Sequence, residues 1–177
     1  MNQAHADGFL SLSQRTGYIT LLCKDKEHPE LLSNWRPISL LNVDYKIISK
    51  VLANRLRKVL SHIVHSDQTC SVPGRTIMDN LHLLRNIVDY CEQKRCQCAI
   101  VSYDQTKAFD RVSHEFLFRV LKAFGFNDSF IKWIQVLYNS VSSRVLVNGF
   151  LSDVFLIYSS VRQGCSLSPL LYILCIR

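Results

Sequence analysis

The sequence lacks the features of membrane, fibrous and secreted proteins. No apolar run reaches the ~20 residues that a helix needs to span a bilayer. The stretch from Met1 to Gln14 is polar and has no apolar centre of the kind found in a signal peptide. Internal repeats and low-complexity linkers are also missing. These absences predict an intracellular chain of the cytoplasm and nucleus that is not secreted and has no membrane partner. They leave the oligomeric state open.

Cysteine is present, but not in a pattern that favours a disulfide framework or a zinc site. The seven cysteines are odd in number and irregularly spaced, which is typical of reduced thiols inside the cell. Cys91, Cys96 and Cys98 cluster, but a C-x4-C-x-C spacing without a fourth ligand is a poor zinc pattern. A structural zinc ion is therefore not expected.

Acidic residues are fewer than basic ones. The 177 residues include 21 Lys and Arg against 14 Asp and Glu, which gives a formal net charge of +7. A basic excess suits a polyanionic partner, although many basic proteins bind nothing acidic. The 48% hydrophobic content suffices for one core, or one core with a small lobe.

The first part of the chain predicts a strand followed by a long helix. Residues 1–16 have no pattern and are expected to be a frayed lead-in. Tyr18–Leu22 is rich in β-formers and predicts a strand. Ser33–Pro37 is expected to be a loop, and Ile38–Leu41 a short extended piece. Asp44–Ile63 carries apolar residues at helical spacing and predicts a helix.

This predicted helix has a basic side. Lys46, Lys50 and Arg57 lie nearly opposite its apolar face, and no acidic residue occurs between Lys46 and Lys58. Such a face is usually only solvated. Because no acidic residue balances it here, we favour a surface that faces nucleic-acid phosphates.

The remaining sequence mixes helices and strands without regular alternation. We expect a helix at Met78–Lys94, a strand at Cys98–Tyr103 covered on both faces, and a hairpin at Arg144–Leu151 returned by Val154–Tyr158. The other predicted helices are Ser113–Phe124, one capped by Asn127 or Asp128 that reaches Asn139, and one opened by Ser168 and Pro169 at its N-cap and first position. In the predicted Met78–Lys94 helix, the residues expected to face inward are Leu81, Leu84, Ile87, Val88 and Cys91. This order favours an α+β fold.

Two carboxylates follow the predicted Cys98–Tyr103 strand. Asp104 would be held rigidly at the strand's end, where a carboxylate can bind Mg²⁺. Asp110 comes six residues later, so its place relative to Asp104 depends on the turn. In the plainer interpretation, Asp104 only caps the strand end and Asp110 caps the helix that begins near Ser113.

Two other segments can present polar groups to a ligand. In the turn before the last helix, Gln163 offers a donor and an acceptor, and Gly164 permits close backbone approach, as to a base or a sugar. The alternative is an ordinary loop–helix junction. Arg36, held extended by Pro37, can clamp phosphate oxygens, or can be one surface arginine among many.

Four blocks in a fixed order resemble the reverse transcriptases of non-LTR (LINE-like) retrotransposons, from about Gly17 onward. The blocks are Arg36-Pro-Ile-Ser-Leu-Leu with Lys46 to Leu56, then Asp67-Gln68 with Pro73-Gly-Arg75 and Asp79-Asn80, then Asp104-Gln-Thr-Lys-Ala-Phe-Asp-Arg-Val112, then Arg162-Gln-Gly-Cys-Ser-Leu-Ser-Pro169. Ser166 stands where the family usually has Pro, and Cys70-Ser71 where a Gly-Phe pair is common. The aromatic-x-Asp-Asp motif that follows in the family is missing, since no acidic residue occurs from Gly164 to Arg177.

The resemblance implies a right-hand polymerase fold, with fingers at about residues 17–97 and an incomplete palm at 98–177. It implies synthesis of DNA on an RNA template from a DNA primer and dNTPs, with Mg²⁺ or Mn²⁺ as the metal. Asp104 would be the catalytic and metal-binding carboxylate. Phe109 would pack under the incoming sugar and Arg36 would neutralise the triphosphate. Gln163 and Gly164 would contact the nucleotide and the template strand.

One carboxylate cannot offset the charge of two metal ions, so we expect no polymerase activity from this chain alone. We also expect an open apolar edge at Ala99–Tyr103, little packing for Leu167–Ile176, and a tendency to aggregate. Three interpretations remain: a fragment of an active reverse transcriptase, a decayed element without a role, or a retained nucleic-acid-binding module without catalysis.

Overall fold

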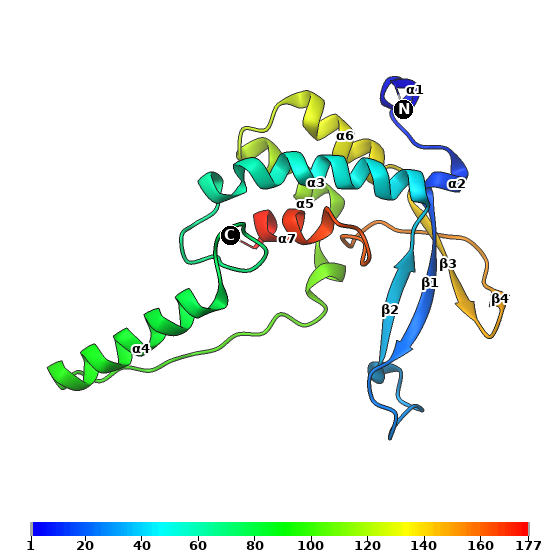
Figure 1. Cartoon of the computed structure of the whole chain (residues 1–177). Coiled ribbons are helices and arrows are strands. Elements are labelled where there is room, and N and C mark those ends of the chain that lie inside the picture. Colours follow the sequence, from blue (N-terminus) through cyan, green and yellow to red (C-terminus); the bar gives the residue numbers. More distant parts are fainter. Residues whose placement is uncertain (1, 177) are drawn as a thin grey trace.

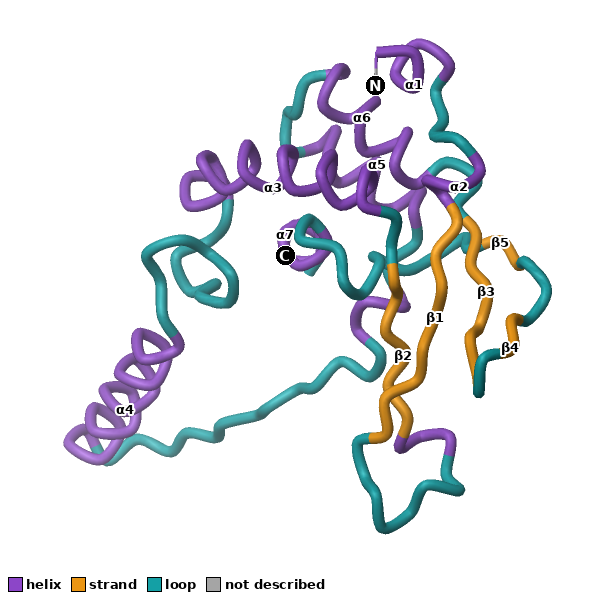
Figure 2. Tube along the Cα trace, turned by 45° about the vertical axis from the view of Figure 1, so that its right-hand side comes forward, coloured by secondary structure: helices purple, strands orange, loops and turns teal. Residues whose placement is uncertain are grey.

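The computed structural model describes residues 2–176, which form a helical body with a sheet beside it and an arm that projects from it (Figure 1). The helices of the body are α3 (Val43–Ile63), α5 (His114–Ala123), α6 (Asp128–Tyr138) and α7 (Ser168–Cys175). The arm consists of α4 (Ile77–Lys94) and the extended segment that returns from it (Figure 2). No helix among residues 2–176 is both long and apolar enough to cross a membrane. The mixture of helices and a mixed sheet confirms the α+β class.

The sheet has the order β2-β1-β3-β4, with β5 also paired to β3. Its strands are β1 (Thr16–Cys23), β2 (Trp35–Leu40), β3 (Ser142–Val147), β4 (Phe150–Leu151) and β5 (Phe155–Leu156). β1 pairs with β2 antiparallel and with β3 parallel. The predicted strand at Tyr18–Leu22 is therefore confirmed, and it is longer than expected.

The expected loop at Ser33–Pro37 is wrong in its second half. A short 3₁₀ helix, η1 (Leu32–Asn34), leads into β2, and Pro37 pairs with Leu21 within that strand. The extended conformation that precedes a proline also suits a strand. β2 lies at the edge of the sheet, where a residue without an N–H group is tolerated.

The Asn148-Gly149 turn is confirmed as the tip of the β3–β4 hairpin. Both residues have positive φ, 50° and 83°, as a tight hairpin turn requires. The return strand is shorter than the predicted Val154–Tyr158, because only Phe155–Leu156 pairs with β3. β4 pairs with the other end of β3, so two short strands together form the partner of β3 on this side.

α3 has the predicted extent and the predicted buried face. Asn42 caps it, with its side chain accepting a hydrogen bond from the Asp44 N–H at 2.8 Å. The apolar residues that the helical spacing singled out lie in the core, apart from the half-buried Ile63: Ile48, Leu52, Leu56 and Leu60. A single face of α3 therefore supports the body of the molecule.

The caps of α5 and α6 follow the sequence. Ser113 accepts a hydrogen bond from the Phe116 N–H at 3.1 Å, and Asn127 accepts one from the Phe130 N–H at 2.8 Å. Asn127 is thus the cap of α6, in preference to Asp128. In α7 the N-cap is Leu167, so Ser168 lies one position further into the helix than we expected.

The expectation that Leu167–Ile176 would lack packing is wrong. α7 lies against α3 and α5, and its apolar residues are among the most buried of the chain: Leu167, Leu170, Leu171 and Leu174. Two helices from earlier in the sequence therefore suffice to bury it. Sequence order alone did not reveal this contact.

The N-terminal residues also differ from expectation. They form two short helices, α1 (Asn2–Asp7) and α2 (Leu12–Arg15), where we expected a frayed lead-in. Leu10, between them, is 1% exposed and belongs to the core. α1 packs on α6, and α2 packs on α3. These contacts and the buried Leu10 fix a stretch whose sequence has no pattern of its own.

α4 has the predicted bounds, but the face expected to be inward is uncovered. Leu81, Leu84 and Ile87 are 51%, 42% and 44% exposed. Val88 and Cys91 are half-buried, and α4 has no buried residue. Helical spacing predicts which residues share a face, but it does not supply the element that covers them.

The predicted strand at Cys98–Tyr103 is wrong for this structure. Residues 96–105 are neither helix nor strand, and Tyr103 is 92% exposed. A strand needs a neighbour to complete its hydrogen bonds, and the arm runs apart from the sheet (Figure 2). The apolar run is therefore an exposed extended segment, and the expectation that both of its faces would be covered is wrong.

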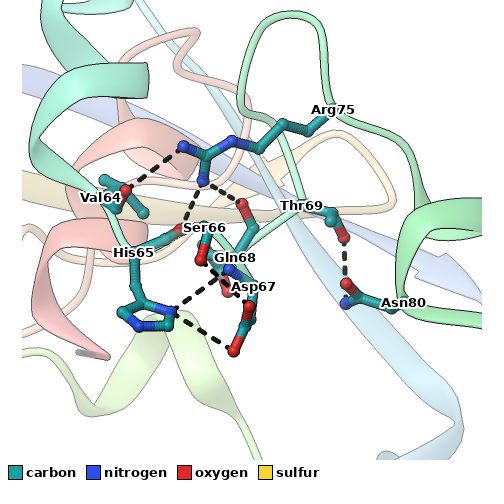
Figure 3. Close-up of polar contacts among 8 residues, drawn as sticks. All are labelled: Val64, His65, Ser66, Asp67, Gln68, Thr69, Arg75 and Asn80. Atoms are coloured by element: carbon teal, nitrogen blue, oxygen red, sulfur yellow. Dashed lines mark hydrogen bonds and ion pairs between the residues drawn. The ribbon is translucent and has the colours of Figure 1, made fainter. Parts of the chain in front are cut away.

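Arg75 ties the α3–α4 connection to the end of α3 (Figure 3). Its guanidinium donates to the carbonyl oxygens of Ser61 and Gln68, both at 2.9 Å, and to those of Val64 and His65. Cationic side chains commonly satisfy the last carbonyls of a helix in this way. Arg75, which belongs to the second of the four family-like sequence blocks, thus holds the base of the arm.

Replacing Arg75 with Gln should lower the free energy of unfolding by about 1–3 kcal/mol, because hydrogen bonds from a charged donor are lost. Urea denaturation followed by tryptophan fluorescence measures this loss. Arg119→Gln on the exposed side of α5 is the matched control and should change stability by less than about 0.5 kcal/mol. Equal effects of the two substitutions would contradict the stabilising role of the Arg75 hydrogen bonds.

The exposed face of α4 should drive aggregation of the isolated chain. The double variant Leu81→Glu, Leu84→Lys should reduce light scattering on concentration without loss of helix content, since both side chains are about half exposed. Leu60→Lys, at a fully buried position of α3, should instead destabilise the fold. Unchanged aggregation of the double variant would show that another surface is responsible.

Candidate nucleotide and nucleic-acid site

The Asp104 segment runs from the arm into the body of the molecule. Residues 104–107 are exposed, Lys107 adopts a left-handed conformation with φ of 51°, and the 3₁₀ helix η2 (Ala108–Arg111) follows. Within η2, the half-buried Phe109 packs on Tyr172 of α7, with ring centroids 5.1 Å apart. The aromatic contact therefore anchors this segment to the last helix.

Tyr172 also interacts with Gln105 and Asp104, which lie where the arm joins the body. Its hydroxyl donates to Gln105 Oε1 at 2.6 Å. Burial raises the pKa of Tyr172, and the negative charge of Asp104 raises it further. Asp104 consequently lies within electrostatic reach of α7, although its own side chain is exposed.

The segments of the third and fourth resembling blocks lie side by side. The Val161 N–H donates to the Phe109 carbonyl at 3.0 Å, and the Ser160 N–H to the Val112 carbonyl at 2.8 Å. The Ser160 hydroxyl donates to Asp110 Oδ1 at 3.4 Å. Asp110 thus accepts from the neighbouring segment, and the expectation that it caps α5 is wrong because Ser113 does so.

Gly164 makes its close backbone approach to this chain itself. Its φ is +92°, and a Cβ atom there would lie 2.7 Å from the carbonyl oxygen of Ser39 in β2. A side chain of any kind would therefore collide with the backbone of the sheet. The glycine is explained by packing, and its predicted contact with a nucleotide stays a prediction.

The same turn borders a shallow groove beside α3. Gly164 and Ser166 form one side, and Lys46 and Lys50 contribute from the helix. Exposed apolar side chains of α3 complete the lining: Val43, Ile47 and Val51. The structure therefore brings two of the predicted basic residues next to one of the predicted nucleotide-contact residues.

The other predicted residues lie outside this groove, as its lining within residues 2–176 shows. Arg36 is exposed on β2, and Gln163 is half-buried next to Gly164. Arg57 is half-buried two turns beyond Lys50 and donates to Asn54 Oδ1 at 3.3 Å. Of the predicted basic trio, only Lys46 and Lys50 meet the Gly164 turn.

Arg162 is a residue whose role the sequence did not reveal. It is 3% exposed, and its Nη2 atom donates to the carbonyl oxygens of Arg15 at 2.6 Å and Ser142 at 3.0 Å. Its guanidinium carbon lies 5.1 Å from the ring centroid of Tyr45. Burial raises the pKa of Tyr45 well above its ordinary value, and Arg162 partly opposes this. Since its partners come from distant parts of the chain, no local signal could have identified it.

The described residues do not form a complete metal site. Among residues 2–176, no group of three or more His, Cys, Asp or Glu side chains is arranged to hold a metal ion. Asp104 stands alone in an exposed segment. Two divalent ions need several anionic ligands close together, so Asp104 by itself does not fit that requirement.

Comparison with known proteins assigns this sequence to a family. The family model "Reverse transcriptase (RNA-dependent DNA polymerase)" matches residues 24–177. The Transposon TX1 uncharacterized 149 kDa protein of Xenopus laevis is 41% identical over all 177 residues, which span 14% of its length. The probable RNA-directed DNA polymerase from transposon BS of Drosophila melanogaster is 31% identical over 84% of the chain and 16% of its own length.

A third relative is the Pol polyprotein of the type-2 retrotransposable element R2DM of Drosophila melanogaster, which is 28% identical over 78% of this chain and 13% of its own length. The chain thus spans about one sixth or less of these relatives. With the family model covering most of the residues, the chain belongs to the reverse transcriptase (RNA-dependent DNA polymerase) family, with homologues in non-LTR retrotransposons.

Proposed function

We propose that this chain supplies the nucleotide-facing and template-facing part of a reverse transcriptase, with fingers at about residues 17–97 and the front of the palm at 98–177. One observation carries the proposal. The Asp104–Asp110 segment and the turn at Gly164 are joined through residues 109–112 and 160–161, and this turn borders the groove that holds Lys46 and Lys50. The segment with the carboxylates and Phe109 is thereby linked to the turn that borders the two lysines.

In this proposal the nucleotide contacts come from both segments. Phe109, whose ring is held by Tyr172, packs under the sugar of the incoming dNTP. Gln163 contacts the nucleotide or template through its amide. Gly164 contributes only backbone groups, since its α-carbon faces Ser39. Arg36 neutralises triphosphate oxygens from the edge strand, as a guanidinium does with fork geometry.

The basic face of α3 is the proposed contact for the RNA template and DNA primer. Lys46 and Lys50 are exposed, and Arg57 continues the same face of the helix. No acidic residue between Lys46 and Lys58 weakens its positive potential. Cations on one helix face bind the phosphate backbone without regard to sequence and release counterions on binding.

Asp104 remains the proposed metal-binding and catalytic carboxylate, with Mg²⁺ or Mn²⁺ as the ion that the family implies. The carboxylates of residues 2–176 do not complete such a site. A two-metal site would need further anionic ligands besides Asp104. The complete polymerase reaction is accordingly a proposal for the longer proteins that resemble this chain.

A non-catalytic nucleic-acid-binding module is the second candidate function. The observation that favours it is the contrast between a groove that holds two lysines and an incomplete set of metal ligands among residues 2–176. Primer extension on an RNA template separates the two candidates. We expect binding by this chain without dNTP incorporation above that of Asp104→Asn, and incorporation above that control would establish catalysis.

Binding of single-stranded RNA should weaken steeply between 50 and 200 mM salt, because the contacts are to phosphates. Lys46→Ala with Lys50→Ala should reduce the slope of log affinity against log salt by about 0.7 unit for each phosphate contact removed. Fluorescence anisotropy with a labelled RNA measures both quantities. Lys122→Ala with Lys132→Ala, at exposed positions of α5 and α6, is the matched control. An affinity independent of salt would contradict the proposal.

Gly164→Ala should lower the free energy of unfolding by about 1–3 kcal/mol through its positive φ, and further through the collision with Ser39. Gly149→Ala is the matched control, because its φ is +83° but a Cβ there meets open space. Urea denaturation should therefore show a larger loss at Gly164 than at Gly149. Equal losses would mean that the turn can move away from β2.

A further inference from the structure

The C-terminal end of α4 brings three thiols together. Arg95 adopts a left-handed conformation with φ of 51° and turns the chain back on the helix. The Cys96 N–H then donates to the Cys91 carbonyl at 3.0 Å, and the Cys96 thiol lies 3.7 Å from the same oxygen. The side chains of Cys96 and Cys98 interact with that of Cys91 and raise its pKa.

This cluster does not form a metal site among the described residues. The contact between thiols instead suits thiol–disulfide chemistry, in which two sulfur atoms must approach each other. Cys96 and Cys98 are exposed, and Cys91 is half-buried. Oxidants therefore reach the two later cysteines more readily than the one on the helix.

The three thiols differ in their readiness to react. Hydrogen bonds with Cys96, and then with Cys98, raise the pKa of the Cys91 thiol to about 12. Cys91 thus loses its proton less readily than an ordinary thiol and is not expected to start the reaction, since the thiolate is the nucleophile. The exposed Cys96 reacts first, and Cys91 follows as the second thiol.

We propose that Cys96 and Cys91 form a redox-sensitive pair that closes into a disulfide when the chain meets a peroxide. The Cys96 thiolate attacks one oxygen of hydrogen peroxide, which gives a sulfenic acid and releases hydroxide. Cys91 then gives up its proton and its thiolate attacks the Cys96 sulfur, so that the S–S bond forms, the S–O bond breaks, and the leaving hydroxide takes up the proton and departs as water. The two sulfur atoms together lose two electrons, and the peroxide gains them.

The bond would fix the junction between α4 and the returning segment of the arm. The segment that begins at Cys96 runs back toward the body and carries Asp104 (Figure 1). Closing the turn at Arg95 covalently removes freedom at the start of this segment. Oxidation would thereby restrain the far end of the arm without touching the groove beside α3.

Tryptic digestion reads out the proposed bond directly. Lys94 and Arg95 lie between the two cysteines, so trypsin separates the peptide 86–94 from the peptide 96–107. After brief hydrogen peroxide treatment and alkylation of free thiols, we expect these peptides to appear as a linked pair. Fragmentation of the pair in the mass spectrometer should place the bond at Cys96 and not at Cys98.

Two comparisons of the rate of disulfide linkage test the proposal. Cys98→Ser should leave the rate of linkage unchanged, whereas Cys96→Ser should slow it several-fold. The native chain should also link several-fold faster than the same chain unfolded in urea, because the turn at Arg95 preorganises the pair. Equal rates in the native and unfolded chains, or linkage through Cys98 in the wild-type chain, would overturn the proposal.

Discussion

The buried guanidinium of Arg162 is the interaction on which the arrangement of this molecule depends. A buried charge is costly unless hydrogen bonds compensate it, and here two carbonyl oxygens accept from Nη2 and an aromatic ring faces the guanidinium. The Nε and Nη1 atoms of Arg162 are buried without a hydrogen-bond partner among residues 2–176. The two carbonyl oxygens and the ring belong to Arg15 just before β1, to Ser142 in β3, and to Tyr45 in α3. One side chain therefore joins the parallel pair of strands to the long helix, and it stands directly before Gln163 and Gly164.

The last helix completes this arrangement. The leucines of α7 fill the space beside α3 and α5, and Tyr172 on the same helix holds Phe109 and Gln105. The fold of the body and the placement of the Asp104 segment consequently have a common support. Since Gly164 touches the backbone of β2, the sheet sets the position of the turn from the other side.

The arm shows the opposite situation. α4 has sound caps and a regular apolar face, yet this face and the apolar residues 100–103 are exposed to solvent. The same structure has a well-packed body and a groove with two lysines. The two lysines proposed to bind nucleic acid are thus present at this groove, whereas residues 2–176 do not complete a set of metal ligands.

The sequence by itself determined the elements whose signals are local. Caps at Asn42, Ser113 and Asn127, the Asn148-Gly149 turn and the buried face of α3 were all predictable, because each depends on residues within one or two turns of the chain. The family resemblance was likewise readable from ordered motifs, and it is confirmed.

Only the tertiary structure decided which elements meet. The contact of Gly164 with Ser39, the partners of Arg162, and the burial of Leu10 and of α7 join residues far apart in sequence. For the same reason, the predicted inward face of α4 and the predicted strand at Cys98–Tyr103 were wrong. A face or a strand is completed only by a partner, and its own residues cannot specify whether that partner is in contact.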